Sequence, residues 1–179
     1  MAALQNPLVD MTRFADCRVL DETGREHSIS KFWEEYPAIL IFLRHFGCIA
    51  CRAHAAEVWH RRDLYQKDGA RIVFIGNGAS DYIHGFKEDL DIRDAPIYTD
   101  PSLEIFACAG FKRGFRNTIN KMSAKNFIQL FADGHRQTLS KGDIWQLGGM
   151  MVVKPGGKLA YHYISEALGD FPPEKDVVS

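Results

Sequence analysis

The chain has 179 residues, of which 46% are hydrophobic and 25% charged, and its formal net charge is -1. This balance is typical of a soluble globular protein with a substantial core, and we expect residues 1–179 to form a single domain. A charge this close to zero gives no general attraction to nucleic acid or to anionic membranes, so neither is expected as a partner.

The apolar segments give no sign of export or of membrane insertion. Residues 1–9 lack the basic start and apolar block of a signal peptide, and the longest apolar run, 38–43, is far too short to span a bilayer. A cytoplasmic protein is therefore the default expectation.

Two strands and a short helix are predicted at the start of the chain. Residues 17–20 are predicted to form a strand that is followed by a turn at 21–24. Ser30 is predicted to cap a short helix that Pro37 ends. Residues 38–46 then predict a strand buried on both faces, because their apolar positions are continuous rather than alternating.

A long helix and a second buried strand are predicted next. Gly47 breaks the preceding strand, and a helix is expected from residue 48 or 49 to residue 67, where Asp68-Gly69 closes it. Residues 71–75 are again continuously apolar after their first position, which indicates another covered strand.

The second half of the chain is predicted to hold three helices and a short strand. Ser80 is the expected cap of the first helix, and Pro101 occupies the favoured first position of the second. The short strand is expected at 96–98, and the third helix at 123–132.

The last predicted feature is a hairpin with strands at 150–153 and 159–164 around a turn at 154–157. Strands that alternate with helices imply parallel pairing, and a late hairpin adds antiparallel strands to the same sheet. The sequence thus predicts an α/β, thioredoxin-like fold, in which a central mixed sheet is flanked by helices and carries inserted helices.

The four cysteines are Cys17, Cys48, Cys51 and Cys108. They are too few for a scaffold of this length that is held together by disulfides. Two of them form a C-x-x-C pair at the point where a buried strand ends and a helix begins. Amide groups and the dipole at a helix N-terminus stabilise a thiolate. We therefore predict a redox pair in which Cys48, the more exposed thiol, attacks and Cys51 resolves.

Two other interpretations compete with redox chemistry at this site: that both residues are ordinary buried cysteines, which the strand–C-x-x-C–helix context disfavours, and that they bind a metal. His45, Cys48, Cys51 and His54 recur every three residues and could suggest a tetrahedral metal site. Residues three apart drift around a helix axis, however, and no second C-x-x-C exists, so no metal is expected. The glycines at 76–78 lack the full dinucleotide fingerprint, and no cofactor is predicted.

Several segments resemble a known family. The residues 42–52, Phe-Leu-Arg-His-Phe-Gly-Cys-Ile-Ala-Cys-Arg, resemble the active-site segment of the AhpC/TSA antioxidant family, in its peroxiredoxin-like 2 branch. Other matches, in the expected order, are Ile75-Gly76-Asn77-Gly78, Tyr98-Thr99-Asp100-Pro101, Gln146-Leu147-Gly148-Gly149, Pro155-Gly156-Gly157 and Gly169-Asp170.

This resemblance implies a thioredoxin fold and antioxidant or thiol-redox chemistry. It implies a peroxide or disulfide as the substrate, and some relatives reduce lipid endoperoxides. Re-reduction by a thioredoxin-type or glutathione system is expected.

The resemblance leaves the attacking cysteine open. Typical peroxiredoxins carry proline seven residues, and threonine three residues, before the peroxide-attacking cysteine. Counted back from Cys51, these places hold Arg44 and Cys48; counted back from Cys48, they hold Ile41 and His45. The thioredoxin analogy favours Cys48 as the attacking residue, whereas the peroxiredoxin count favours Cys51.

A few residues outside the pair are candidates for supporting roles. Arg52, which follows the motif, could stabilise a thiolate or polarise a peroxide oxygen, or could simply face solvent. Of Arg44 and His45, at the end of the central strand, one is expected to face the site unless both are solvated. Cys108 is interpreted as a small core residue rather than as a distant resolving cysteine, and Cys17 as a strand residue without a partner.

Two functions follow from these observations. The first is a thiol-dependent oxidoreductase that cycles Cys48 and Cys51 between dithiol and disulfide. The second is a non-catalytic redox sensor or partner-binding module on the same scaffold, and sustained turnover would discriminate between them. Nothing in the sequence fixes the oligomeric state, and a homodimer is compatible with it.

Overall fold

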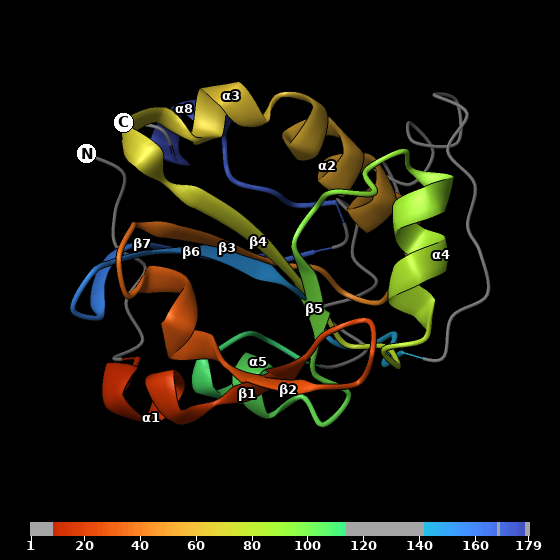
Figure 1. Cartoon of the computed structure of the whole chain (residues 1–179). Helices are drawn as coiled ribbons and strands as arrows, with labels where there is room; N and C mark the ends of the chain where they lie inside the picture. Colours follow the sequence, from red (N-terminus) through yellow and green to blue (C-terminus); the bar gives the residue numbers. More distant parts are fainter. Residues whose placement is uncertain (1–8, 114–141, 168, 178–179) are drawn as a thin grey trace.

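A seven-stranded mixed sheet, in the order β2-β1-β5-β4-β3-β6-β7, organises the computed structural model of the chain (Figure 1). The structure describes residues 9–113, 142–167 and 169–177. The strands are β1 (Arg18–Leu20), β2 (Glu26–Ser28), β3 (Ala38–Phe42), β4 (Arg71–Gly76), β5 (Ile97–Thr99), β6 (Gly149–Lys154) and β7 (Lys158–Ile164).

The pairing of the strands is that of the predicted fold. The central strand β3 runs parallel to β4, and β4 runs parallel to β5. On its other side β3 pairs antiparallel with β6, the first strand of the hairpin β6–β7. The mixed sheet and the late hairpin are therefore confirmed.

Helices cover both faces of the sheet. In Figure 1, α2, α3 and α8 lie on one face and α1 and α5 on the other. The helices are α1 (Met11–Asp16), α2 (Ile49–His60), α3 (Arg62–Tyr65), α4 (Tyr82–Asp89), α5 (Glu104–Cys108) and α8 (Glu174–Val177), with 3-10 turns η1 (Ile29–Trp33) and η2 (Lys67–Gly69).

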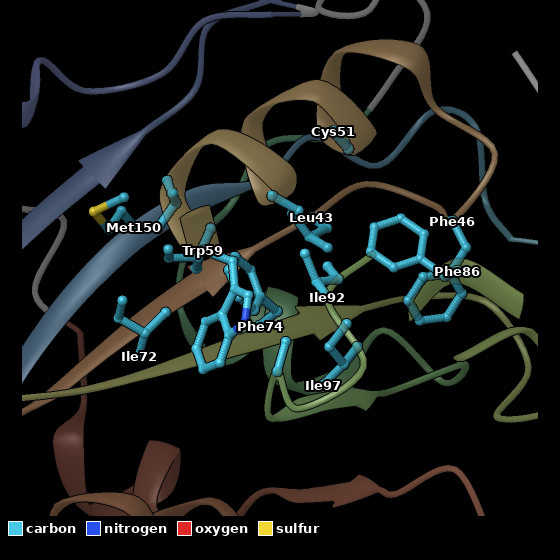
Figure 2. Packing of buried hydrophobic residues seen from close by; sticks show 14 of the residues in the cluster. Leu43, Phe46, Cys51, Trp59, Ile72, Phe74, Phe86, Ile92, Ile97 and Met150 are labelled. Carbon is cyan, nitrogen blue, oxygen red and sulfur yellow. The ribbon is translucent and has the colours of Figure 1, made fainter. Parts of the chain in front are cut away.

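Strand β3 is apolar throughout because its two faces belong to two different cores. Ile39 and Ile41 pack in the cluster beneath α2 and α4. Figure 2 shows Trp59 and Phe74 of the same cluster. Leu40, on the opposite face, packs in the cluster beneath α1 and α5. Side chains alternate across a strand, so a strand covered on both faces must be apolar at every position.

The central strand is shorter than the sequence predicts. It ends at Phe42 rather than at residue 46, and residues 43–48 form an irregular connection to α2. Phe46 is nevertheless buried, because its ring packs against Phe86 of α4 with centroids 5.2 Å apart (Figure 2). An apolar loop side chain that fills a core position cannot be distinguished from a strand residue by its hydropathy.

The predicted long helix is broken after His60. Arg61 leaves helical geometry, with φ −107° and ψ 20°, so α2 is followed by the separate short elements α3 and η2. Helix α5 begins at Glu104 rather than at Pro101, because Leu103 adopts a left-handed conformation with φ 65°. The carboxylate of Asp100 accepts the amide of Ile105 at 2.8 Å and thereby satisfies an open amide of this late start.

Smaller boundary errors affect the other predicted elements. The capping positions are Ser28 for η1 and Asp81 for α4, rather than Ser30 and Ser80, and neither makes a capping hydrogen bond through its side chain. Strand β5 begins one residue later than predicted.

Three elements were not predicted at all: α1, β2 and α8. The sequence signal for α1 is Asp10, whose carboxylate accepts the amides of Thr12 and Arg13 at 3.0 and 3.1 Å. Asp10 is therefore an ordinary N-cap residue.

The predicted helix at 123–132 lies outside the described residues. Just before residue 114, Lys112 pairs with Glu166, and Arg113 pairs with Asp143 at 2.6 Å. Among the described residues, no helix has the length and hydropathy needed to cross a membrane.

Gly148 brings the segment before β6 into close contact with the end of β3. A Cβ at this position would lie 1.8 Å from the carbonyl oxygen of Phe42. We expect Gly148→Ala to destabilise the fold by about 1–3 kcal/mol, because backbone must move to admit the methyl group. Gly85→Ala is the matched control: an added Cβ meets nothing within 4 Å in α4, and we expect a gain of about 0.5–1 kcal/mol. Urea unfolding of both variants tests this, and equal effects would contradict it.

Candidate active site

The cysteine pair lies at the start of α2, directly after the connection that leaves the central strand. Cys48 is the N-cap residue of the helix, and its carbonyl accepts the amide of Arg52 at 2.9 Å. Cys51 lies in the first turn, and Figure 2 shows it on the inner side of the helix. The strand-to-helix placement predicted for the pair is therefore present in the structure.

The expected difference in exposure between the two thiols is wrong. Cys48 is 3% exposed and Cys51 is 2% exposed, and both are free thiols. Position at the N-terminal end of α2 therefore does not make Cys48 accessible.

Arg44 donates hydrogen bonds to both sulfur atoms of the pair. Its guanidinium donates from Nη1 to Cys48 Sγ at 3.5 Å, and its backbone amide donates to Cys51 Sγ at 3.3 Å. The rest of the guanidinium is fixed by two carbonyl oxygens: Nε donates to Gln146 at 3.1 Å, and Nη2 donates to Ile144. Arg44 is thus the residue of the 44–45 pair that faces the thiols.

The electrostatics of the site separate the two thiols. A hydrogen bond from the Cys51 thiol and the positive charge of Arg44 lower the pKa of Cys48 to about 6, against the opposing effect of burial. Burial and the neighbouring Cys48 sulfur raise the pKa of Cys51 well above the ordinary value. The arrangement therefore supports a Cys48 thiolate beside a protonated Cys51 thiol.

Arg52 is neither placed to stabilise the thiolate or a peroxide oxygen nor exposed to solvent. Its side chain is buried, and Nη2 donates to the Asp89 carboxylate at 3.0 Å. The guanidinium also lies 5.6 Å from the ring centroid of Phe86. Arg52 therefore ties α2 to α4, and the cationic role near sulfur belongs to Arg44 instead.

The two histidines of the alternative metal interpretation lie in different environments. His54 stacks on Phe171 with ring centroids 3.8 Å apart, whereas His45 lies in the connection before α2, near Asp143. Over residues 9–113, 142–167 and 169–177, no group of three or more His, Cys, Asp or Glu side chains could hold a metal ion.

A small pocket adjoins the pair on the side of Cys51. It is lined by Cys51, Arg44, Phe42 and Gly148, together with residues from the segment that follows β7: Ser165, Ala167, Gly169, Asp170 and Phe171. The late glycine–aspartate motif at 169–170 thus contributes to the surroundings of the site, which its position in the sequence did not reveal.

Sequence reasoning missed the segment that positions Arg44. Gln146 is 3% exposed, and its side-chain amide donates to the carbonyls of Lys112 and Leu147. These bonds fix the backbone that accepts the Arg44 guanidinium. The Gln-Leu-Gly-Gly motif at 146–149 was the available signal, although its contact with Arg44, 102 positions away, is a product of the fold.

His54 makes the stability of the protein dependent on pH. Burial lowers the pKa of His54 to about 4, below the ordinary value of 6.5, so the folded state favours the neutral ring. Between pH 6.5 and 4 the unfolded chain therefore binds a proton that the folded protein does not. The contribution of the neutral His54 ring to the free energy of unfolding is fully present above about pH 6.5 and is lost as the pH falls towards 4. We expect His54→Phe, which keeps an aromatic ring against Phe171, to lose less stability over this interval. Urea midpoints at several pH values measure it; identical pH dependence in both proteins would contradict the assignment.

The fold and the site define the class of this protein: it is a thioredoxin-fold protein with a thiol pair at the start of the helix that follows the central strand. The solved structure of the peroxidoxin BcpB from Mycobacterium tuberculosis is similar, with a TM-score of 0.65 at 18% identity, over 92% of this chain and 89% of that one. At this identity the similarity shows the fold.

Sequence comparison identifies the family. The AhpC/TSA antioxidant enzyme family matches residues 58–167, a segment that begins after the cysteine pair. The thioredoxin-like protein AAED1 of Arabidopsis thaliana is 30% identical over 90% of this chain and 68% of its own length. The prostamide/prostaglandin F synthase of Danio rerio is 32% identical over 87% of this chain and 79% of its own. The chain belongs to the AhpC/TSA family and is a peroxiredoxin-like thiol oxidoreductase, which confirms the resemblance found in the sequence.

Proposed function

We propose that this protein reduces a peroxide or a disulfide by cycling Cys48 and Cys51 between dithiol and disulfide, with Cys48 as the attacking residue. The observation that carries the proposal is the environment of Arg44. This cation is 7% exposed, and among the described residues its side chain contacts two carbonyl oxygens and Cys48 Sγ but no carboxylate. A buried charge is costly unless it is paired, and a Cys48 thiolate supplies the missing negative charge.

The cycle can be written with this chain's own groups. The Cys48 thiolate attacks one peroxide oxygen, the O–O bond breaks, and the leaving oxygen takes a proton and departs as an alcohol or water. Arg44, already beside the sulfur, can stabilise the negative charge that develops on the leaving oxygen. The Cys51 thiol then attacks the sulfenic sulfur of Cys48 and water leaves, which forms the disulfide.

The asymmetry of the pair suits this order of events. Cys51 remains protonated while Cys48 reacts, because its pKa is raised by burial and by the Cys48 sulfur. Once Cys48 is oxidised, the neighbouring negative charge is gone and Cys51 can act as the resolving thiol. A thioredoxin-type or glutathione reductant would return the disulfide to the dithiol by exchange, and a reducing compartment such as the cytoplasm would suit the cycle.

The relatives suggest which substrates to test. Several are prostamide/prostaglandin F synthases at 28–32% identity, so a lipid of the prostaglandin type joins hydrogen peroxide as a candidate. The decisive assay is steady-state turnover of wild type, Cys48→Ser and Cys51→Ser with hydrogen peroxide, an organic hydroperoxide and a protein disulfide. Each is run with a thioredoxin system and with glutathione. Turnover that persists in both variants would overturn the proposal.

One observation favours the second function, a redox sensor or partner-binding module. Both thiols are almost completely buried, at 3% and 2% exposure, so a substrate must displace surrounding residues to reach them. A sensor would form the disulfide once per oxidation event without sustained consumption of peroxide. Continued consumption in the presence of a recycling system would exclude this alternative.

A further inference from the structure

The two cysteines outside the site lie together on the opposite face of the sheet. Cys17 follows α1 and is 5% exposed, and Cys108 is the last residue of α5 and is partly exposed. Both belong to or pack against the cluster beneath α1 and α5, and the Cys108 side chain is close enough to Cys17 to raise the pKa of its thiol. The expectation that Cys17 has no partner is therefore wrong.

The surroundings of the two thiols give them different reactivity. Burial, the neighbouring Cys108 side chain and the nearby carboxylates of Glu104 and Asp100 raise the pKa of Cys17 well above the ordinary range. Cys17 Sγ also donates a hydrogen bond to the carbonyl oxygen of Arg13 at 3.6 Å. Cys17 is thus held as a thiol, whereas Cys108 is the sulfur that an oxidant in solution reaches first.

We propose that Cys17 and Cys108 form a second, independent redox site, which a small hydroperoxide oxidises to a disulfide that joins the C-cap residue of α1 to α5. Cys108 Sγ attacks one oxygen of the peroxide, the O–O bond breaks, and water or an alcohol leaves with Cys108 as the sulfenic acid. Cys17 Sγ then attacks the Cys108 sulfur, the S–O bond breaks, and the hydroxyl departs as water with the Cys17 proton. Two electrons pass from the pair to the peroxide, and a dithiol reductant reverses the reaction by exchange.

Tryptic peptides of this chain separate the two redox sites. Cys17 falls in peptide 14–18, Cys108 in peptide 94–112, and both active-site cysteines in peptide 45–52. The folded Cys48→Ser/Cys51→Ser variant and wild type are treated with hydrogen peroxide, alkylated, digested without reduction and analysed by mass spectrometry. We expect peptides 14–18 and 94–112 to be joined in both proteins, with the loss of two hydrogen atoms. The linked form should account for most of the oxidised Cys108.

The matched control is Cys17→Ser, which removes the resolving thiol and keeps a group that can donate to the carbonyl of Arg13. In this variant, Cys108 should accumulate as a sulfenic acid that a trapping reagent labels. Sulfenic or sulfinic Cys108 that remains unlinked when Cys17 is present would overturn the proposal. So would a Cys17 and Cys108 pair that stays reduced throughout the treatment. Because the active-site cysteines are absent from the double variant, this outcome is independent of the function proposed for Cys48 and Cys51.

Discussion

Replacing Cys48 by serine is expected to abolish thiol chemistry at the active site, with a loss of turnover of about 1000-fold or more. Cys48 is the thiol whose pKa is lowered to about 6, by the Cys51 thiol and by Arg44, so it is the thiolate at neutral pH. Serine in its place offers no comparable nucleophile, and the remaining Cys51 is held as a thiol by burial.

The companion variant, Cys51→Ser, should fail at a later step. Cys48 can still attack, but no neighbouring thiol is left to release the intermediate. Mixed disulfides with a protein substrate, or a sulfenic acid after treatment with peroxide, should therefore accumulate on Cys48. Capture of intermediates by Cys48→Ser, and not by Cys51→Ser, would reverse the assigned roles and restore the peroxiredoxin register.

Removing the charge of Arg44 is expected to have the second largest effect. Arg44→Met should raise the pKa of Cys48 from about 6 towards the ordinary value of a thiol, because the guanidinium at 3.5 Å no longer stabilises the thiolate. In wild type the reactivity of Cys48 rises as the pH passes through about 6 and is lost below it. In the variant this rise moves to higher pH, and reactivity at pH 7 should fall about tenfold.

The rate of alkylation of Cys48 as a function of pH, followed on peptide 45–52, measures this shift. Arg52→Met is the matched control, because Arg52 is also a buried cation near the pair but is bonded to Asp89. It should leave the pH profile of Cys48 in place. Arg44→Lys, which keeps the charge, should recover part of the loss. Equal shifts in Arg44→Met and Arg52→Met would show that the effect is structural rather than electrostatic.

The sheet could be predicted because its central strands carry a local signal. Residues 38–42 and 72–75 are apolar on both faces, and a strand covered on both faces requires this. The ends of elements were less predictable. Phe46 is buried as part of a loop, packed on Phe86, and its hydropathy is the same as it would be in a strand.

The sequence predicted those parts of the site whose residues are close together in the chain, and it did not predict the contacts between distant segments. Cys48 and Cys51 are separated by two residues and lie at a strand-to-helix junction, which the sequence pattern shows directly. The role of Arg44 depends on carbonyl groups about 100 positions later, at Ile144 and Gln146. Cys51 likewise adjoins residues that are distant in sequence, such as Gly148 and Asp170. Position at a helix end does not reveal burial, and the expected exposure of Cys48 was wrong.

The central claim, that Cys48 and Cys51 are one redox pair with Cys48 attacking, is tested most directly by the state of peptide 45–52 after a single equivalent of hydrogen peroxide. Wild type should lose two hydrogen atoms within this peptide through an internal disulfide, and Cys51→Ser should carry a trapped sulfenic acid on Cys48. Thiols that remain free in peptide 45–52 while other cysteines oxidise would contradict the account. So would a sulfenic acid on Cys51 of Cys48→Ser while Cys48 of Cys51→Ser stays reduced.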